Sequence, residues 1–363
     1  MSDLEPLRVA VVGCGDISRG YGESLKTRPD RISIVGAFDL DADRARAFVE
    51  EYGGRVYDDL KDVIDDPDVE AVVNLTSHLA HAEVSAAALS AGKHVHSEKP
   101  LAATWEDGKH LLDLAEKHDV RLSCSPFTFL GEAQETARKA IQDGMIGKPL
   151  MTYAEMNWAR IELWHPNPEG FYQSGAGPML DVGVYALTVL TTILGPVTRV
   201  LGHAAILIPE RTIGRGPKAG KTFRVTTPDQ VTGFLTFASG AQARVTASFL
   251  GYSRQGGVEF HGEKGSLILG SSHNFEAKVE LHTVEDSQWR AVPYVAEPFL
   301  GVEWGRALFE LAESIRTGAP QRCTGKQAYH VLDICLSILE SAEQGHAVSV
   351  ESTFSPPPPR YFE

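Results

Sequence analysis

Residues 97–101, with the sequence SEKPL, combine side chains that can move a proton. They follow a short β-like run at residues 94–96 and so lie at the predicted carboxyl end of a strand, the edge where open α/β sheets bind ligands. Pro100 restricts the backbone of Lys99 to extended conformations, which fixes the direction of the lysine. A lysine that is partly desolvated beside a positive charge can exchange protons near neutral pH. Lys99 is therefore our first candidate catalytic residue.

The elements that must position Lys99 alternate between strands and helices through the first third of the chain. Apolar runs typical of strands occupy residues 8–12, 31–38, 71–76, 94–97 and 120–124. Helical patterns occupy residues 41–52, 82–91 and 104–117. The last of these begins with a capping box at Thr104. This alternation predicts right-handed βαβ units and a parallel sheet, which we place in a dinucleotide-binding domain of residues 1–125.

The turn after the first predicted strand has the pattern of a dinucleotide site, Gly13-x-Gly15-x-x-Ser18. Gly13 permits a tight turn, Gly15 lets a pyrophosphate approach the backbone, and the small Ser18 lets the next helix pack against the strand. The N-terminus of that helix then presents unpaired N–H groups to the phosphates. A glycine-rich turn without a ligand is the alternative interpretation of this motif.

Asp39 ends the second predicted strand, at roughly the 20-residue spacing from the glycines that such sites have. A carboxylate there accepts hydrogen bonds from the adenosine ribose and repels a 2′-phosphate, so NAD is expected and NADP is less favoured. The competing role for Asp39 is to cap the next helix, but Asp41 can fill that role. The loop from Thr76 to His81 leaves a further strand at the same edge and is a second candidate cofactor contact.

Three residues with metal-binding side chains, His94, His96 and Glu98, alternate along one face of a predicted strand. Because no further Cys, His or carboxylate has ligand spacing nearby, a packed or hydrogen-bonded strand face is favoured and no metal site is predicted. The four cysteines are far apart and form no C-x-x-C motif, so neither a disulfide framework nor a zinc knuckle is expected.

The 363-residue chain has a formal net charge of -14, which argues against nucleic acid or an anionic membrane as its partner. No apolar run is long enough to span a bilayer. The first residues, Met1 to Leu7, are acidic and lack the apolar segment of a signal peptide. A cytoplasmic protein is therefore expected.

Residues 126–363 are predicted to form an α+β domain for substrate binding and oligomerisation. Strand-like runs occupy residues 151–158, 197–208, 230–238, 241–249, 258–261 and 266–269. Their polar alternation predicts a large, mostly antiparallel open sheet with helices on one face and a candidate subunit interface on the other. Residues 210–227, rich in Lys, Arg and Gly, are expected to form a mobile, exposed loop without function.

Residues 158–174 mix aromatic with hydrogen-bonding side chains, among them Trp158, Trp164 and His165. Such a mixture suits a sugar ring, whose faces stack while its hydroxyls form hydrogen bonds, although a packed surface loop is an equal alternative. In the helical pattern that follows, Asp181 and Tyr185 are spaced i, i+4 and share one face. An acid in an apolar helix either caps a neighbouring group or takes part in catalysis. Tyr185 can equally be an aromatic residue of the core.

Together these features resemble the Gfo/Idh/MocA oxidoreductases, the family of glucose-fructose oxidoreductase and inositol dehydrogenase. The resemblance covers nearly the whole chain and implies a Rossmann domain followed by an α/β domain with a large open sheet, usually paired into a homodimer or homotetramer. It rests on the order and spacing of the motifs Gly13-x-Gly15-x-x-Ser18, Thr76 to His81, Glu98-Lys99-Pro100 and Gly175-x-Gly177-x-x-x-Asp181-x-Gly183.

The resemblance also implies roles for the matched residues. Lys99 and Asp181 take the catalytic positions. Tyr185 stands where the family commonly has histidine, so either Tyr185 or His165 is the acid/base partner of Lys99. From the composition of residues 158–174 and the resemblance together, the expected substrate contacts are Trp158, Trp164, His165, Asp181 and Tyr185. The expected cofactor contacts are Gly13, Gly15, Asp16, Ile17, Asp39, Thr76, His81, Glu98 and Lys99.

The resulting prediction is an NAD-dependent dehydrogenase that acts on a secondary alcohol of a sugar, polyol or related cyclic compound, with Lys99 taking the hydroxyl proton. Two alternatives fit the same residues. One is NAD-assisted glycoside cleavage through transient oxidation of the sugar. The other is a nucleotide- or sugar-sensing regulator without turnover.

Overall fold

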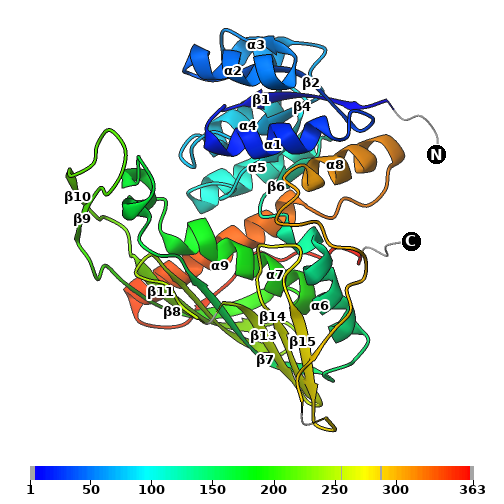
Figure 1. Ribbon diagram of the computed structural model, residues 1–363, viewed down its shortest axis with the longest axis vertical. Helices are drawn as coiled ribbons and strands as arrows, with labels where there is room; N and C mark the ends of the chain where they lie inside the picture. The colour runs from blue at the N-terminus through cyan, green and yellow to red at the C-terminus, as the bar shows by residue number, and fades with distance from the viewer. Residues whose placement is uncertain (1–4, 255, 287, 360–363) are drawn as a thin grey trace. The chain divides into compact units, whose positions relative to one another are not determined.

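The computed structural model describes residues 5–254, 256–286 and 288–359, which fold into two compact units (Figure 1). Unit 1 comprises the chain up to Phe127 together with Glu303–Tyr329, and unit 2 comprises Thr128–Val302 and the chain from His330 onward. The segment Glu303–Tyr329 was expected in the second domain, and this expectation is corrected by the structure.

Hydrogen bonds over long sequence separations explain why this segment belongs to unit 1. The guanidinium of Arg316 donates to the two carboxylate oxygens of Glu70 at 2.8 and 2.6 Å. The side-chain amide of Gln321 donates to the backbone oxygen of Leu122 at 2.9 Å. Neither partner is marked by local composition, which is why sequence patterning did not reveal the return of the chain.

Unit 1 is built on a six-stranded parallel sheet in the order β3-β2-β1-β4-β5-β6. Helices cover both faces of such a sheet, so its strands read as continuous apolar runs, and all four residues of β4 are buried. The elements of unit 1 are β1 (Leu7–Val12), α1 (Asp16–Lys26), β2 (Ile32–Phe38), α2 (Ala42–Tyr52), β3 (Arg55–Val56), α3 (Leu60–Asp65), β4 (Ala71–Asn74), α4 (His81–Ser90), β5 (His94–Ser97), α5 (Trp105–Lys117), β6 (Leu122–Cys124) and α8 (Arg306–Thr317).

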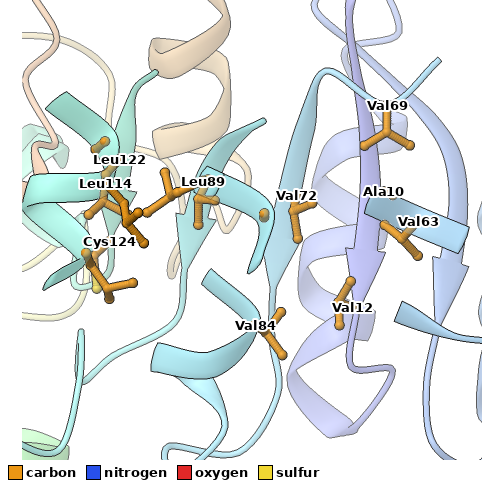
Figure 2. Packing of buried hydrophobic residues seen from close by; sticks show 14 of the residues in the cluster. Ala10, Val12, Val63, Val69, Val72, Val84, Leu89, Leu114, Leu122 and Cys124 are labelled. Carbon is orange, nitrogen blue, oxygen red and sulfur yellow. The ribbon is translucent and has the colours of Figure 1, made fainter. Parts of the chain in front are cut away.

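The core of unit 1 consists mainly of valines and leucines from the central strands and the helices that cover one face of the sheet (Figure 2). Val12 and Val72 come from β1 and β4, while Val84 and Leu89 of α4 pack against them. The predicted helix cap at Thr104 is confirmed, because its hydroxyl accepts a hydrogen bond from the backbone N–H of Asp107 at the start of α5. The packing of these apolar side chains between the strands and helices holds the ends of the strands at fixed positions.

The strand order of unit 1 reverses between β1 and β4, whose crossovers run in opposite directions along the sheet. The carboxyl ends of parallel strands next to such a switch point are where open α/β sheets bind ligands. The segments that leave this edge are the glycine loop after β1, Asp39 after β2, the Thr76 loop after β4 and Glu98-Lys99 after β5. The fold therefore places the predicted cofactor residues on one edge.

Unit 2 contains a nine-stranded sheet in the order β16-β15-β14-β13-β7-β12-β11-β8-β17. All neighbouring strands are antiparallel except β7 and β12, so the predicted mostly antiparallel sheet is confirmed. The elements are η1 (Thr128–Leu130), α6 (Glu132–Gln142), β7 (Pro149–Asn157), η2 (Ile161–Leu163), η3 (Glu169–Tyr172), η4 (Met179–Gly183), α7 (Val184–Leu194), β8 (Val197–Ala205), β9 (Glu210–Thr212), β10 (Thr222–Arg224), β11 (Gln230–Phe237), β12 (Gln242–Ser248), β13 (Gly257–Gly262), β14 (Gly265–Leu269), β15 (Val279–Thr283), β16 (Arg290–Ala291), α9 (Gly325–Gln344, which begins in unit 1) and β17 (Val348–Ser349).

Helices α6, α7 and α9 pack on one face of this sheet (Figure 1). The approach of α9 is close: a Cβ on Gly202 of β8 would lie 1.9 Å from the backbone oxygen of Ile338. On the alternating positions that face away from α9, Leu201 and Phe234 are directly paired between β8 and β11 and are about half exposed. The sheet thus has one helix-covered face and one face with exposed apolar side chains.

Residues 210–227 are largely exposed, as their composition suggested, but they are not wholly irregular. They form a two-stranded hairpin, β9 and β10, with Thr222 opposite Thr212 and Arg224 opposite Glu210. The side chain of Arg211 within β9 is fully buried. One basic residue of this stretch is therefore paired inside unit 2, whereas Arg215, Lys221 and Arg224 are exposed.

Candidate functional site

The glycine loop between β1 and α1 is tightly packed at Gly13 and open at Gly15. Gly13 has a φ of +93°, and a Cβ there would lie 2.7 Å from backbone atoms of Leu75 and Thr76, so only glycine fits. At Gly15, by contrast, a Cβ would meet no atom within 4 Å, which leaves open space beside the backbone. Gly15 is the N-cap of α1 and forms no side-chain cap, so the first N–H groups of the helix face that space.

Asp39 connects the end of β2 to this glycine loop. Its Oδ2 accepts a hydrogen bond from the backbone N–H of Cys14 at 2.7 Å, and its Oδ1 accepts one from the N–H of Asp41 at 2.8 Å. Asp41 itself caps α2 by accepting from the N–H of Asp43, which leaves Asp39 outside the helix cap. An ionised carboxylate has about four acceptor positions, so Asp39 retains capacity for ribose hydroxyls.

The loop after β4 is tied to the segment after β5 by His81. The His81 ring is 1% exposed, with Nδ1 2.8 Å from the backbone oxygen of Pro100 and Nε2 3.0 Å from that of Thr76. Burial lowers the pKa of His81 below its ordinary value. The hydroxyl of Thr76 donates to the side chain of Asn74 at 2.6 Å. His81 is a predicted cofactor contact, and both of its ring nitrogens lie against backbone oxygens that hold this loop in place.

Glu98 and Lys99 lie where the sequence predicted, directly after β5. The Glu98 carboxylate is buried and accepts a hydrogen bond from the backbone N–H of Lys99 at 3.0 Å. It also accepts from the Tyr21 hydroxyl at 2.7 Å and from the Ser125 hydroxyl at 3.0 Å. Tyr21 on α1 was missed by sequence reasoning, because its spacing from Glu98 carries no local signal.

Unit 2 has a cavity of about 340 Å³ at the carboxyl end of β7. Two predicted substrate residues, Trp158 and Tyr185, line it together. The ring of His273 lines it as well and lies 4.9 Å from the Tyr185 ring, centroid to centroid. The remaining described lining residues are mostly small or polar: Glu155, Met156, Asn157, Ser253, Gly256, Gly257, Gly270, Ser271, Ser272 and Asn274. An aromatic wall with many hydroxyl and amide groups suits a polyhydroxylated ring.

The other predicted substrate residues are Trp164, His165 and Asp181, which are not among the described residues that line this cavity. Trp164 packs edge-on against Trp158 at 6.2 Å, and His165 continues the contact with Trp164 at 5.7 Å. Both tryptophans are about 40% exposed, which leaves aromatic surface for a ligand. Asp181 is half-buried and belongs to η4, a π-helical turn before α7, rather than to the helix that bears Tyr185.

A buried charge network supports the loop that carries these aromatics. Arg211 donates to Glu162 at 2.9 Å and to Asp229 at 2.6 Å, and all three side chains are fully buried. Tyr172 donates to Glu162 at 2.5 Å, and its ring lies 4.5 Å below the Arg211 guanidinium. Burial alone raises the pKa of Glu162, but the bonds from Tyr172 and Arg160 hold it below its ordinary value.

Among the described residues, the structure shows neither a disulfide nor a metal site. All four cysteines are free and buried, and burial raises the pKa of the Cys14 thiol to about 12, so it stays neutral. Within the described ranges, no group of three His, Cys, Asp or Glu side chains is arranged to hold a metal ion. None of the described helices is both long and apolar enough to cross a bilayer.

Comparison with known proteins relates both units to one family. Residues 7–125 match a family model described as an oxidoreductase family with an NAD-binding Rossmann fold, and residues 134–268 match the GFO/IDH/MocA C-terminal domain. The chain is 30% identical over 274 residues to dTDP-3,4-didehydro-2,6-dideoxy-alpha-D-glucose 3-reductase of Actinomadura kijaniata, covering 74% of this chain and 76% of that one. It is 28% identical over 352 residues to 1,5-anhydro-D-fructose reductase of Ensifer adhaerens, covering 95% and 99%.

Among solved structures, the fold is similar to that of a levoglucosan dehydrogenase in complex with NADH and levoglucosan. The TM-score is 0.83 at 23% identity, over 96% of this chain and 100% of that one. The two proteins therefore share a fold over nearly the whole chain.

Proposed function

Because the chain belongs to the GFO/IDH/MocA family of NAD-binding oxidoreductases, we propose that it transfers hydride between NAD and a secondary alcohol of a sugar, polyol or related cyclic compound. The observation that carries the proposal is the position of Lys99. It leaves the sheet of unit 1 on the same edge as the glycine loop and Asp39. The relatives from Ensifer and Actinomadura, both named as reductases of sugar-derived compounds, support this substrate class.

The residues of unit 1 fit NAD. The open space at Gly15 and the N-terminus of α1 would hold the pyrophosphate, with Asp16 and Ile17 in the first turn of that helix. Asp39 would accept hydrogen bonds from the adenosine ribose, and Thr76 would line the adjacent loop. When bound, NAD supplies the hydride acceptor. The protein's own contribution is to orient the two reactants and to remove the hydroxyl proton.

We assign removal of that proton to the Lys99 side-chain amine, assisted by Asp181 and with Tyr185 as its acid/base partner. Asp181 and Tyr185 would also bind the substrate hydroxyls. Trp158 would stack on the ring of the substrate inside the cavity that it shares with Tyr185. Trp164 and His165 would extend this aromatic surface. His165 is the alternative acid/base partner, but the described lining of the cavity contains Tyr185 and not His165.

The test is a nicotinamide absorbance assay of purified protein with NAD and a panel of inositols, aldoses, anhydrosugars and glycosides. Net NADH formation with members of the panel supports the proposal and identifies the substrate. Tyr185→Phe and His165→Gln distinguish the two candidate partners of Lys99, because only the true partner should lower turnover by more than about tenfold. Absence of NADH with every compound, in a protein that binds NAD, counts against the proposal.

Asp39→Ser is expected to weaken NAD binding about tenfold and to reduce the preference for NAD over NADP by a larger factor. The variant removes both the ribose acceptor and the charge that repels a 2′-phosphate. Asp41→Ser is the matched control, since serine can still cap α2 and the residue lies two positions away. Calorimetric titration of each variant with NAD and NADP gives both dissociation constants. An unchanged ratio in Asp39→Ser would refute the assignment of Asp39.

We further propose that the exposed face of the unit 2 sheet mediates a homodimer or homotetramer. Leu201, Phe234 and Met151 are 43%, 54% and 42% exposed there, and such surface favours burial in an interface. Phe234→Glu should shift the sedimentation-equilibrium mass of the wild type toward the 39.4 kDa monomer. A wild type that already sediments as a monomer would rule out this interface.

A further inference from the structure

We propose that Tyr21 is a positioning residue for Lys99, acting through the carboxylate of Glu98. The inference rests on the proposed role of Lys99 and concerns unit 1 alone. Tyr21 lies on α1, the helix that begins at the glycine loop, and its side chain is completely buried. Its hydroxyl reaches Glu98, which follows β5 on the same sheet edge.

The carboxylate of Glu98 accepts hydrogen bonds from three sides. Tyr21 and Ser125 donate to Oε1 at 2.7 and 3.0 Å, and the backbone N–H of Lys99 donates to Oε2 at 3.0 Å. Each oxygen is therefore held by a separate partner, which fixes the plane of the carboxylate. The bond to the Lys99 N–H then fixes the backbone from which the lysine side chain leaves.

The protons of this cluster can be assigned one by one. Tyr21 has a single hydroxyl proton, which it donates to Glu98, so its oxygen accepts from Nε2 of His96 at 3.1 Å. That contact requires a proton on Nε2 and leaves Nδ1 of His96 to accept from the Ser123 hydroxyl at 2.9 Å. Burial lowers the pKa of His96 to about 4, so the neutral ring persists at physiological pH.

The Tyr21 ring is also held in place by packing. The rings of His96 and Trp304 each lie 5.8 Å from it, and that of Phe127 lies 6.5 Å away, centroid to centroid. The hydroxyl therefore has a fixed position between α1 and the segments after β5 and β6. Because α1 starts at the pyrophosphate cradle, Tyr21 links the position of the cofactor loop to that of Lys99.

Tyr21→Phe keeps this ring and removes only the hydroxyl. We expect kcat to fall about tenfold, since a hydrogen bond to a charged group is lost next to the reacting lysine, while the Kd for NAD changes less than twofold. The matched control is Tyr57→Phe, which also removes a buried hydroxyl that donates to a carboxylate, that of Asp66, at the β3 edge of the same sheet. It should lower stability to a similar extent without changing kcat.

Two further measurements separate positioning from a general loss of structure. If Tyr21 acts through Glu98, Tyr21→Phe should lower kcat less than twofold in a Glu98→Gln background. Hydrogen exchange of the peptide that contains the Lys99 amide should accelerate in Tyr21→Phe but not in Tyr57→Phe. Full additivity in the cycle, or equal exchange in the two single variants, would overturn the proposal. The exchange experiment needs no turnover, so it stays decisive even if the wild type oxidises no compound of the panel.

Discussion

Lys99→Met is expected to lower kcat by about 10² to 10⁴, the range that general acid–base catalysis contributes, while the Kd for NAD changes only a fewfold. Methionine keeps the length of the side chain but cannot take a proton. The loss should therefore appear in the chemical step rather than in cofactor binding. Turnover with each active compound of the panel and calorimetric titration with NAD measure the two effects.

Lys93 at the other end of the same strand provides the control. Its side-chain amine donates to the backbone oxygens of Asp66 and Val69 at 2.7 and 2.8 Å, so Lys93→Met removes structural hydrogen bonds and leaves the ligand edge intact. We expect it to lower stability and to leave kcat within about twofold. Equal losses of kcat and NAD affinity in Lys99→Met would contradict a role of Lys99 in proton transfer.

Arg211→Met is expected to destabilise unit 2 by about 3–5 kcal/mol, because it leaves two buried carboxylates without their cation. Glu162 and Asp229 are both fully buried, and each loses a hydrogen bond from the guanidinium. The loop that bears Trp164 is anchored through Glu162, so the fluorescence of its tryptophans should report the change. Denaturant unfolding of the variant, followed by this fluorescence, gives the loss of stability.

Lys218→Met on the same hairpin is the matched control. Lys218 pairs with Glu169 at 2.8 Å, but both side chains are more than one third exposed, and such pairs contribute at most about 1 kcal/mol. A loss in Arg211→Met no larger than that in Lys218→Met would contradict the inference that the network supports the loop.

The architecture of unit 1 could be predicted because its determinants are local. Strands of a parallel sheet are buried on both faces, so β4 reads as a continuous apolar run in the sequence. The special backbone at Gly13 is likewise recorded by the residue itself, since a side chain would collide with the backbone of Leu75 and Thr76, directly after β4. Because the strands could be located from these local patterns, the residues that follow each strand could be assigned to one sheet edge from the sequence alone.

What the sequence did not reveal depends on pairing over long separations. Arg211 lies in a stretch rich in Lys, Arg and Gly, yet its charge is matched by Glu162 and Asp229, 49 and 18 residues away. His273, in the segment after β14, meets Tyr185 of α7 far from it in the sequence. Likewise, Tyr21 and Glu98 are 77 residues apart and meet through the packing of α1 on the sheet. Composition and periodicity record none of these pairings.

The most direct test of hydride transfer uses an active compound deuterated at the carbon that bears the reacting hydroxyl. We expect that one deuterium appears on the nicotinamide for each NADH formed, and that none is taken up from heavy water during the reaction of undeuterated substrate. Deuterium that returns to a cleaved product without accumulation of reduced cofactor would instead establish transient oxidation. A complete absence of transfer to NAD would contradict the dehydrogenase account.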